Sequence, residues 1–160
     1  MELARADVIV GDLETELLAA YPQLARRLAL VLRDHVEAQD IAQAAFARAL
    51  ERRDRFHGGD ARAWLYTIGI NLALNELRRR HRVVSLTEDV EPEWAMTSQP
   101  DLWIALGALK AEHRAALVLS VLDGYTHAEI GALLGVRPGT VSSWLSRSRD
   151  RLRRDLGSES

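Results

Sequence analysis

A chain of 160 residues can form one helical domain or two small ones, and a hydrophobic content of 48% is enough to build a core. The absence of cysteine excludes disulfides, thiolate metal sites and cysteine nucleophiles. The formal net charge of −2 points to no partner, and no apolar run approaches the ~18 residues of a membrane span. The acidic start, MELARADVIVGDLETE, lacks a signal-peptide pattern, so we expect a cytoplasmic protein without membrane insertion.

Charge is unevenly distributed along the chain. Residues 1–47 hold 4 basic and 8 acidic groups, residues 48–82 hold 9 and 4, residues 83–100 hold 0 and 4, and residues 101–160 hold 8 and 7. Positive charge therefore gathers in the second block and, within the last block, in Arg147–Arg154. Local basic patches are what contact with nucleic-acid phosphates requires, and a small net charge can conceal them.

The first part of the chain has helical periodicity almost throughout. Two helical segments are predicted over 12–20 and 22–34, with a break near Tyr21 and Pro22, because proline removes an intrahelical hydrogen bond. A further helix is predicted over about 37–53. Its inward positions are expected to be Ile41, Ala44, Ala45, Ala49 and Leu50.

A loop and a long helix complete this part. Residues 56–60 are predicted as the loop, with Asp60 as the N-cap of a helix that runs from about 61 to 81. The cations of Arg78–Arg82 lie at the C-terminal end of this helix, where they suit both the helix dipole and a row of phosphates.

Residues 83–100, VVSLTEDVEPEWAMTSQP, interrupt the helical pattern. They are acidic, contain Pro92 and Pro100 and show no sustained period, which indicates a linker between two domains. When fully extended, these 18 residues reach at most ~60 Å. Two domains so joined can occupy DNA sites separated by more than one helical turn, about 34 Å.

The last part is predicted to contain helices over 101–111 and 112–123, followed by a helix-turn-helix over 125–152. Thr126 and Glu129 have the spacing of a capping box at the start of the first helix of this motif.

The second helix of the motif is expected to follow a turn at Gly135 and to have Pro138 in its first turn. Val141, Leu145 and Leu152 lie near one inner stripe. The residues left on or beside the outer face are Ser142, Ser143, Ser146, Arg147 and Arg149. In such motifs the second helix enters the major groove of duplex DNA.

These elements together predict an all-α fold of two small helical domains joined by an acidic linker. The expected boundaries are 1–82 for the first domain, 83–100 for the linker and 101–160 for the second domain, a four-helix domain with a helix-turn-helix.

Three segments carry recognisable patterns. Residues 36–50, VEAQDIAQAAFARAL, are similar to D-A-E-D-L-V-Q-E-x-F-x-R-A-L, and residues 63–79, AWLYTIGINLALNELRR, to W-L-x-x-I-A-x-N-x-x-x-D-x-x-R-R. Residues 135–149, GVRPGTVSSWLSRSR, are similar to G-V-x-x-G-T-V-K-S-R-L-x-R-A-R. In this order, and with the acidic linker between them, they resemble the extracytoplasmic-function (ECF) sigma factors of the sigma-70 family. The resemblance covers roughly residues 12–156.

The resemblance implies a promoter-specificity subunit of bacterial RNA polymerase. Contact with the core polymerase would fall to Asp40, Gln43, Phe46 and Arg48. Capture and opening of the −10 promoter element would fall to Phe56, Arg62, Trp64, Tyr66, Asn71, Asn75, Arg78, Arg79 and Arg80. Reading of the −35 element would fall to Arg137, Thr140, Ser142, Ser143, Trp144, Arg147 and Arg149.

Several of these positions also fit a structural role. Opening a promoter takes a positive groove and stacking platforms for bases, each stack being worth ~1–3 kcal/mol. Trp64 nevertheless has the helical spacing of a core residue, Phe56 could seal the loop, and Asn71 fits a buried hydrogen-bonding position equally well.

The chain departs from the family pattern at several points. Ser142 stands where lysine is usual and Trp144 where arginine is usual. Ala44 replaces an acidic residue, Asn75 an aspartate, and the pair Gly69 and Ile70 an Ala-Arg pair. An alternative function follows from these substitutions: a sigma-like interaction protein that binds an anti-sigma factor as a decoy or adaptor, with weakened DNA binding.

Catalysis is not expected. The five histidines are scattered without the spacing of a helical metal pair, so we expect no metal, no cofactor, no catalytic residue and no small-molecule substrate. The expected partners are core RNA polymerase, promoter DNA and an anti-sigma factor. Since few residues follow the last predicted helix, we expect control by such a partner rather than by an appended sensory domain.

Overall fold

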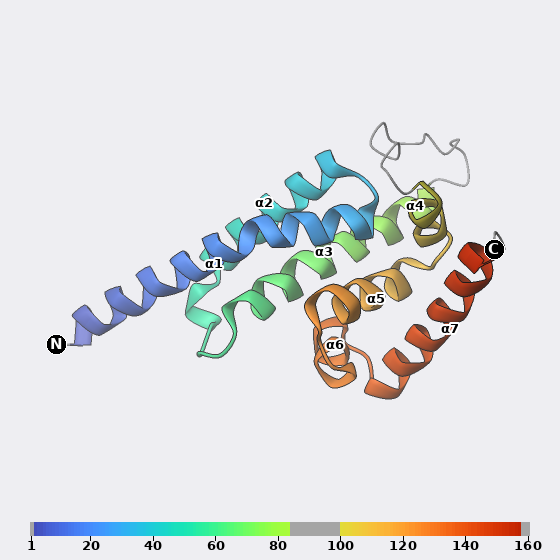
Figure 1. Ribbon diagram of the computed structural model, residues 1–160. Coiled ribbons are helices and arrows are strands. Elements are labelled where there is room, and N and C mark those ends of the chain that lie inside the picture. Colours follow the sequence, from blue (N-terminus) through green and yellow to red (C-terminus); the bar gives the residue numbers. More distant parts are fainter. Residues whose placement is uncertain (1, 84–99, 158–160) are drawn as a thin grey trace.

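The computed structural model describes residues 2–83 and 100–157, with side chains at 12–80 and 101–157. Regular structure in these ranges is helical throughout (Figure 1). The elements are α1 (Glu2–Leu32), α2 (His35–Glu51), the 3-10 helix η1 (Arg53–Arg55), α3 (Ala61–Val83), α4 (Pro100–Gly107), α5 (Ala111–Asp123), α6 (His127–Leu134) and α7 (Pro138–Gly157). The predicted all-α fold is confirmed; most of the predicted linker lies outside the described residues.

Helices α1, α2 and α3 pack on one another as an N-terminal domain. Leucines of α1 and α3, such as Leu24 and Leu65, are fully buried between them. Helix α2 contributes a stripe of small residues instead, Ala38, Ala42, Ala45 and Ala49, all buried. Because alanine side chains are short, α2 lies close against its neighbours.

The predicted break at Pro22 is wrong, because α1 continues through it. Pro22 is exposed, while Leu17, Leu24 and Leu28 on the opposite face are completely buried. A proline inside a helix costs ~3 kcal/mol, and fully burying one leucine returns about 1.5–3 kcal/mol. Burial along a single continuous stripe therefore outweighs the local signal of the proline.

Other predicted helix boundaries also differ: α1 starts at Glu2, ten residues before the predicted start. Ala44 is exposed rather than inward, and the inward position is Ala42. Helix α2 starts at His35, where the carboxylate of Asp34 accepts from two backbone N–H groups, and ends at Glu51. Helix α4 ends at Gly107, four residues before the predicted boundary.

Helices α4 to α7 form a C-terminal domain. Helix α7 packs against α4, α5 and α6, and the core between these helices includes Leu119, Ile130, Val141 and Leu145. No helix in residues 2–83 and 100–157 combines the length and the apolar character needed to cross a membrane.

The two domains lie directly against each other. Helix α5 contacts α1 and α3, and α6 contacts α3, so the buried core is continuous from one domain to the other (Figure 1). The linker length left room for two separated domains. The structure instead has them side by side, and this contact determines which predicted DNA-binding residues are accessible.

Candidate nucleic-acid interface

Helices α6 and α7 form the predicted helix-turn-helix. The capping box is confirmed: the Thr126 hydroxyl accepts from the Glu129 N–H, and the Glu129 carboxylate accepts from the Thr126 N–H, each at 3.1 Å. Gly135 closes α6 with a φ of 73°. Gly131 has a different role, since a Cβ there would lie 2.6 Å from the carbonyl oxygen of Val136. The two helices therefore meet at a tight turn of fixed geometry.

The outer face of α7 is polar and basic. Val141 and Leu145 are buried against the domain, as predicted from their spacing. The side chains exposed on or just before α7 are those of Arg137, Ser142, Ser143, Ser146, Arg147 and Arg149, and Thr140 is half-buried. A helix of this kind offers hydroxyl and guanidinium donors to phosphates and base edges.

Trp144 lies differently from the other predicted −35 residues. Its ring stacks on the imidazole of His113 in α5, with centroids 5.2 Å apart and planes 28° from parallel. The side chain is half-buried, so much of the indole belongs to the packing between α7 and α5. Burial, and then the charges of Lys110 and Arg147, lower the pKa of His113 below its ordinary value of 6.5.

The arginines at the end of α3 form a second basic surface. Arg78 donates to Glu112 of the C-terminal domain at 3.1 Å, and Arg79 donates to Glu76. Arg80 donates to Glu37 of α2, whose pKa is raised by burial despite that guanidinium. These pairs are partly or largely exposed, and exposed pairs contribute little stability. Phosphates can therefore displace the carboxylates at low cost.

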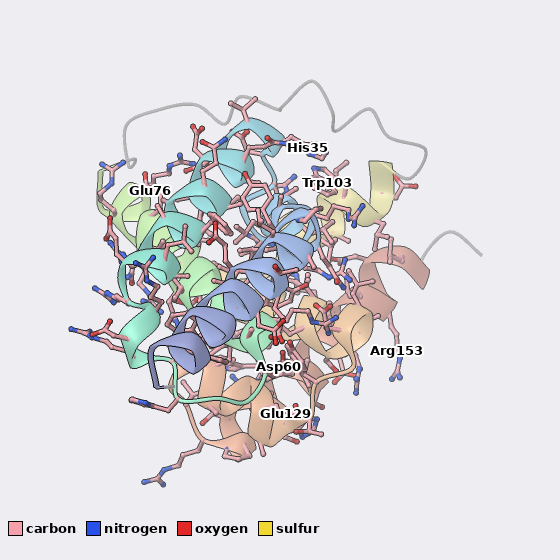
Figure 2. All side chains as sticks on the ribbon, turned by 90° about the vertical axis from the view of Figure 1, so that its left-hand side faces the viewer. His35, Asp60, Glu76, Trp103, Glu129 and Arg153 are labelled. Atoms are coloured by element: carbon pink, nitrogen blue, oxygen red, sulfur yellow. The ribbon has the colours of Figure 1, made fainter. Side chains whose placement is uncertain are left out.

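The loop before α3 carries further cations and an aromatic pair. Arg52, Arg53 and Arg55 are exposed. Phe56 and Trp64 lie with their ring centroids 5.3 Å apart, both half-buried. The backbone N–H of Ala63 donates to the carboxylate of Asp60 at 3.2 Å, which confirms the predicted cap (Figure 2).

Three predicted −10 residues contact the other domain. Tyr66 is completely buried, and burial and then the nearby carboxylate of Asp123 raise the pKa of its hydroxyl. Arg62 lies over the rings of Tyr66 and Tyr125. Asn71 donates to the carbonyl of Leu133, close to the C-terminal end of α6, at 3.0 Å. In this arrangement a base cannot stack on Tyr66. The side chains of Arg62 and Asn71 already contact residues of the C-terminal domain.

The predicted polymerase-binding residues lie along α2. Asp40, Gln43 and Arg48 are exposed. Phe46 is half-buried and packs edge-on against Tyr21 of α1, with centroids 6.0 Å apart. Three of the four side chains are therefore accessible on one helix.

Sequence reasoning missed Asp123, a buried carboxylate between the domains. Its side chain has no solvent exposure. Gln23 Nε2 donates to it at 3.1 Å, Arg27 Nε at 2.9 Å and the Tyr66 hydroxyl at 3.5 Å, while Arg62 Nη2 lies 3.9 Å away. The sequence offered one signal: an acidic residue at a helix C-terminus opposes the helix dipole.

Arg114 is a second missed residue. It is buried in α5 and donates to the carbonyls of Val31 in α1, of Leu106 in α4 and of Leu109 just after α4. Burial lowers the pKa of this guanidinium to about 10. One side chain therefore satisfies carbonyl groups at the ends of two helices, one from each domain. Its position within an apolar stretch, AEHRAALVLS, was the available signal.

The described residues contain no group of three or more histidine, aspartate or glutamate side chains that could hold a metal ion. The features that can act chemically there are the exposed polar and basic faces of α7 and of the α3 end. They define a DNA-binding protein of two helical domains.

Comparisons with known proteins agree with this class. The family model for Sigma-70 region 2 matches residues 17–83, and the model for Sigma-70 region 4 matches residues 101–152. The chain is 32% identical over 146 residues to the RNA polymerase sigma factor CarQ of Myxococcus xanthus, covering 85% of this chain and 84% of that relative. It is 36% identical over 137 residues to the ECF sigma factor SigE of Mycolicibacterium smegmatis, covering 78% of this chain but 53% of that relative.

A solved structure is similar over nearly the whole chain. It is the sigma factor RpoE of Bartonella quintana in complex with the anti-sigma factor NepR, with a TM-score of 0.78, 29% identity, and coverage of 93% of this chain and 99% of that one. The chain belongs to the ECF sigma factors of the sigma-70 family.

Proposed function

We propose that this chain directs core RNA polymerase to promoters by dividing the work between its domains. Residues 1–82 bind the core and engage the −10 element, residues 83–100 link the domains, and residues 101–160 read the −35 element. The exposed polar and basic face of α7, opposite the buried Val141 and Leu145, is the observation that carries the proposal. The protein works with polymerase in the cytoplasm and has no catalytic activity of its own.

Core binding is assigned to Asp40, Gln43 and Arg48 on the exposed face of α2, beside Phe46. In many sigma factors this face would carry an additional acidic residue, but here Ala44 is exposed in that place. The contact with the polymerase is therefore expected to depend more heavily on Asp40.

Engagement of the −10 element is assigned to two surfaces of the N-terminal domain. The loop that includes Phe56, with Trp64 behind it, offers aromatic rings to an exposed strand. The α3 end, with Asn75, Arg78, Arg79 and Arg80, offers charge to the backbone of that strand. Single-stranded DNA is generally held by this combination of stacking and positive charge.

An anti-sigma factor is the proposed regulator. The similar structure from Bartonella quintana is a sigma factor bound to its anti-sigma factor, and that likeness extends over both domains. The alternative, a sigma-like protein that serves only as a decoy for such a partner, is favoured by one observation: Trp144 packs on His113 where the family usually has a cation facing DNA.

Run-off transcription with purified core polymerase and a promoter library separates these functions. We expect transcripts that require this protein and share two upstream elements. The variant Asp40→Ala should abolish them while leaving binding of an anti-sigma factor intact. Glu16→Ala, at an exposed position of α1, serves as the control. Binding to core without any protein-dependent transcript would contradict the proposal and support the decoy function.

A further inference from the structure

A buried negative charge, the carboxylate of Asp123, lies at the contact between the domains. Asp123 is the last residue of α5, followed by Gly124 in the left-handed conformation. A negative charge at a helix C-terminus is unfavourable for that helix. Burying a carboxylate costs free energy unless hydrogen bonds and opposite charges compensate for it.

The compensating groups all come from the N-terminal domain. Gln23 and Arg27 on α1 and Tyr66 on α3 donate to the Asp123 carboxylate, and Arg62 adds a second positive charge. We call these five residues the latch. Since the partners of Asp123 lie 57 to 100 residues away in sequence, the latch exists only when the domains are together.

The contact between the domains holds three residues that the sequence pattern predicted to bind DNA. Arg62, Tyr66 and Asn71 were predicted from the family resemblance to engage the −10 element, yet the first two belong to the latch and Asn71 donates to Leu133 of the other domain. A side chain that contacts Asp123 or Leu133 cannot contact a DNA strand at the same time. The closed arrangement and full engagement of the −10 element therefore exclude each other.

The two basic surfaces are well separated in the closed arrangement. Glu76, which marks the arginine end of α3, and Arg153 of α7 lie on opposite sides of the view in Figure 2. A second contact adds to the closure: the guanidinium of Arg33, just after α1, lies 5.8 Å from the centre of the Trp103 ring in α4. Gly107 makes room for it, since a Cβ there would clash with Arg33 Nη1.

We propose that Asp123 acts as an interdomain latch that keeps the free protein closed, and that the latch must open before the protein engages a promoter. The second part of this inference rests on the proposed function. In a two-state equilibrium, the apparent affinity for DNA is reduced by the fraction of molecules that are open. A weakened latch therefore raises that affinity without a new DNA contact.

Asp123→Asn tests the latch because it removes the charge with almost no change of shape. The helix dipole of α5 favours the change, so the C-terminal domain should keep its fold. Arg27 and Arg62 are then left facing a neutral amide, and the ratio of open to closed molecules should rise by roughly tenfold to a hundredfold. Asp155→Asn is the matched control, since Asp155 lies in the last turn of α7, is exposed and pairs with Arg151 of the same helix.

The measurement is an electron-spin distance distribution in the free protein. Because the chain contains no cysteine, Ala19→Cys on α1 and Arg153→Cys on α7, both at exposed positions, can be labelled specifically. We expect one short distance in the unmodified background and in Asp155→Asn, and a longer, broader distribution in Asp123→Asn. Circular dichroism of each variant checks that its helix content is retained.

Arg27→Gln removes a latch partner on the N-terminal domain. It tests the proposal if Asp123→Asn loses helix content. It should also lengthen the distance, and the double variant should add little to either single variant. Unchanged distances in folded Asp123→Asn or folded Arg27→Gln would overturn the proposal. The measurement contains neither polymerase nor DNA, so its outcome is separate from that of run-off transcription.

Discussion

Trp144 is the residue whose identity and position are hardest to reconcile with a standard recognition helix. Sequence reasoning noted that it replaces a usual arginine and, from the resemblance, expected it at the −35 element. The stack on His113 explains its identity, because an indole buries its face between α7 and α5 without adding a positive charge near Lys110 and Arg147. Periodicity could not show this, because the partner ring lies in another helix.

The stack predicts the pH behaviour of His113. Its pKa in the folded protein is below 6.5 because burial and nearby cations disfavour the protonated ring. The unfolded chain therefore binds more protons in this range, and stability falls as the pH drops from above 6.5 through the folded pKa. Nuclear magnetic resonance of the ring should give a midpoint below 6.5, which Trp144→Ala should raise.

A control variant separates this effect from other titrations. His113→Phe keeps a ring for Trp144 but cannot be protonated. The unfolding free energy of the unmodified protein, minus that of His113→Phe, should become smaller on acidification from about pH 7.5 to about pH 5.5. A midpoint at or above 6.5 would contradict the burial of this imidazole.

Ser142 offers a second prediction at this scale. It is exposed on the outer face of α7, where the family usually has lysine. Ser142→Lys should add one phosphate contact, so the slope of log affinity against log salt for a −35 fragment should steepen by about 0.9. Ala47→Lys adds the same charge on α2 and should leave the slope unchanged. Equal slopes for both variants would mean that this face of α7 does not meet the DNA backbone.

At the scale of elements, the local sequence predicted a helix end correctly where neighbouring residues form the cap or the turn themselves. The capping box of α6, the turn at Gly135 and the cap at Asp60 all follow from residues within a few positions of one another. The break at Pro22 failed because burial along the whole of α1 outweighs one local penalty. A rule that considers only neighbouring residues cannot include that burial.

The capping box gives a quantitative test. Thr126→Ala removes the hydroxyl that accepts from Glu129, and the reciprocal bond loses its fixed geometry. The free energy of unfolding should fall by about 1 kcal/mol in denaturant titrations. His127→Ala, at the next and exposed position, should change it by less than ~0.5 kcal/mol. Equal effects would show that the cap does not stabilise the helix-turn-helix.

At the scale of the whole molecule, the sequence predicted two domains but not their contact. The residues that join them, such as Asp123, Arg114 and Asn71, are single polar side chains with no periodic pattern. Their partners lie far away in the chain, and nothing in the local sequence of Asp123 specifies Arg27. The candidate DNA-binding residues were identifiable from motifs, whereas the burial of Tyr66 depends on the packing of α3 against α5.

The most direct test of the account measures the same interdomain distance before and after promoter binding. Protein labelled at Ala19→Cys and Arg153→Cys is examined alone, and then with core polymerase and a promoter fragment found by run-off transcription. We predict a short distance in the free protein and a much longer one in the complex, because each domain then occupies its own promoter element. A long distance in the free protein, or an unchanged short one in the complex, would contradict the account.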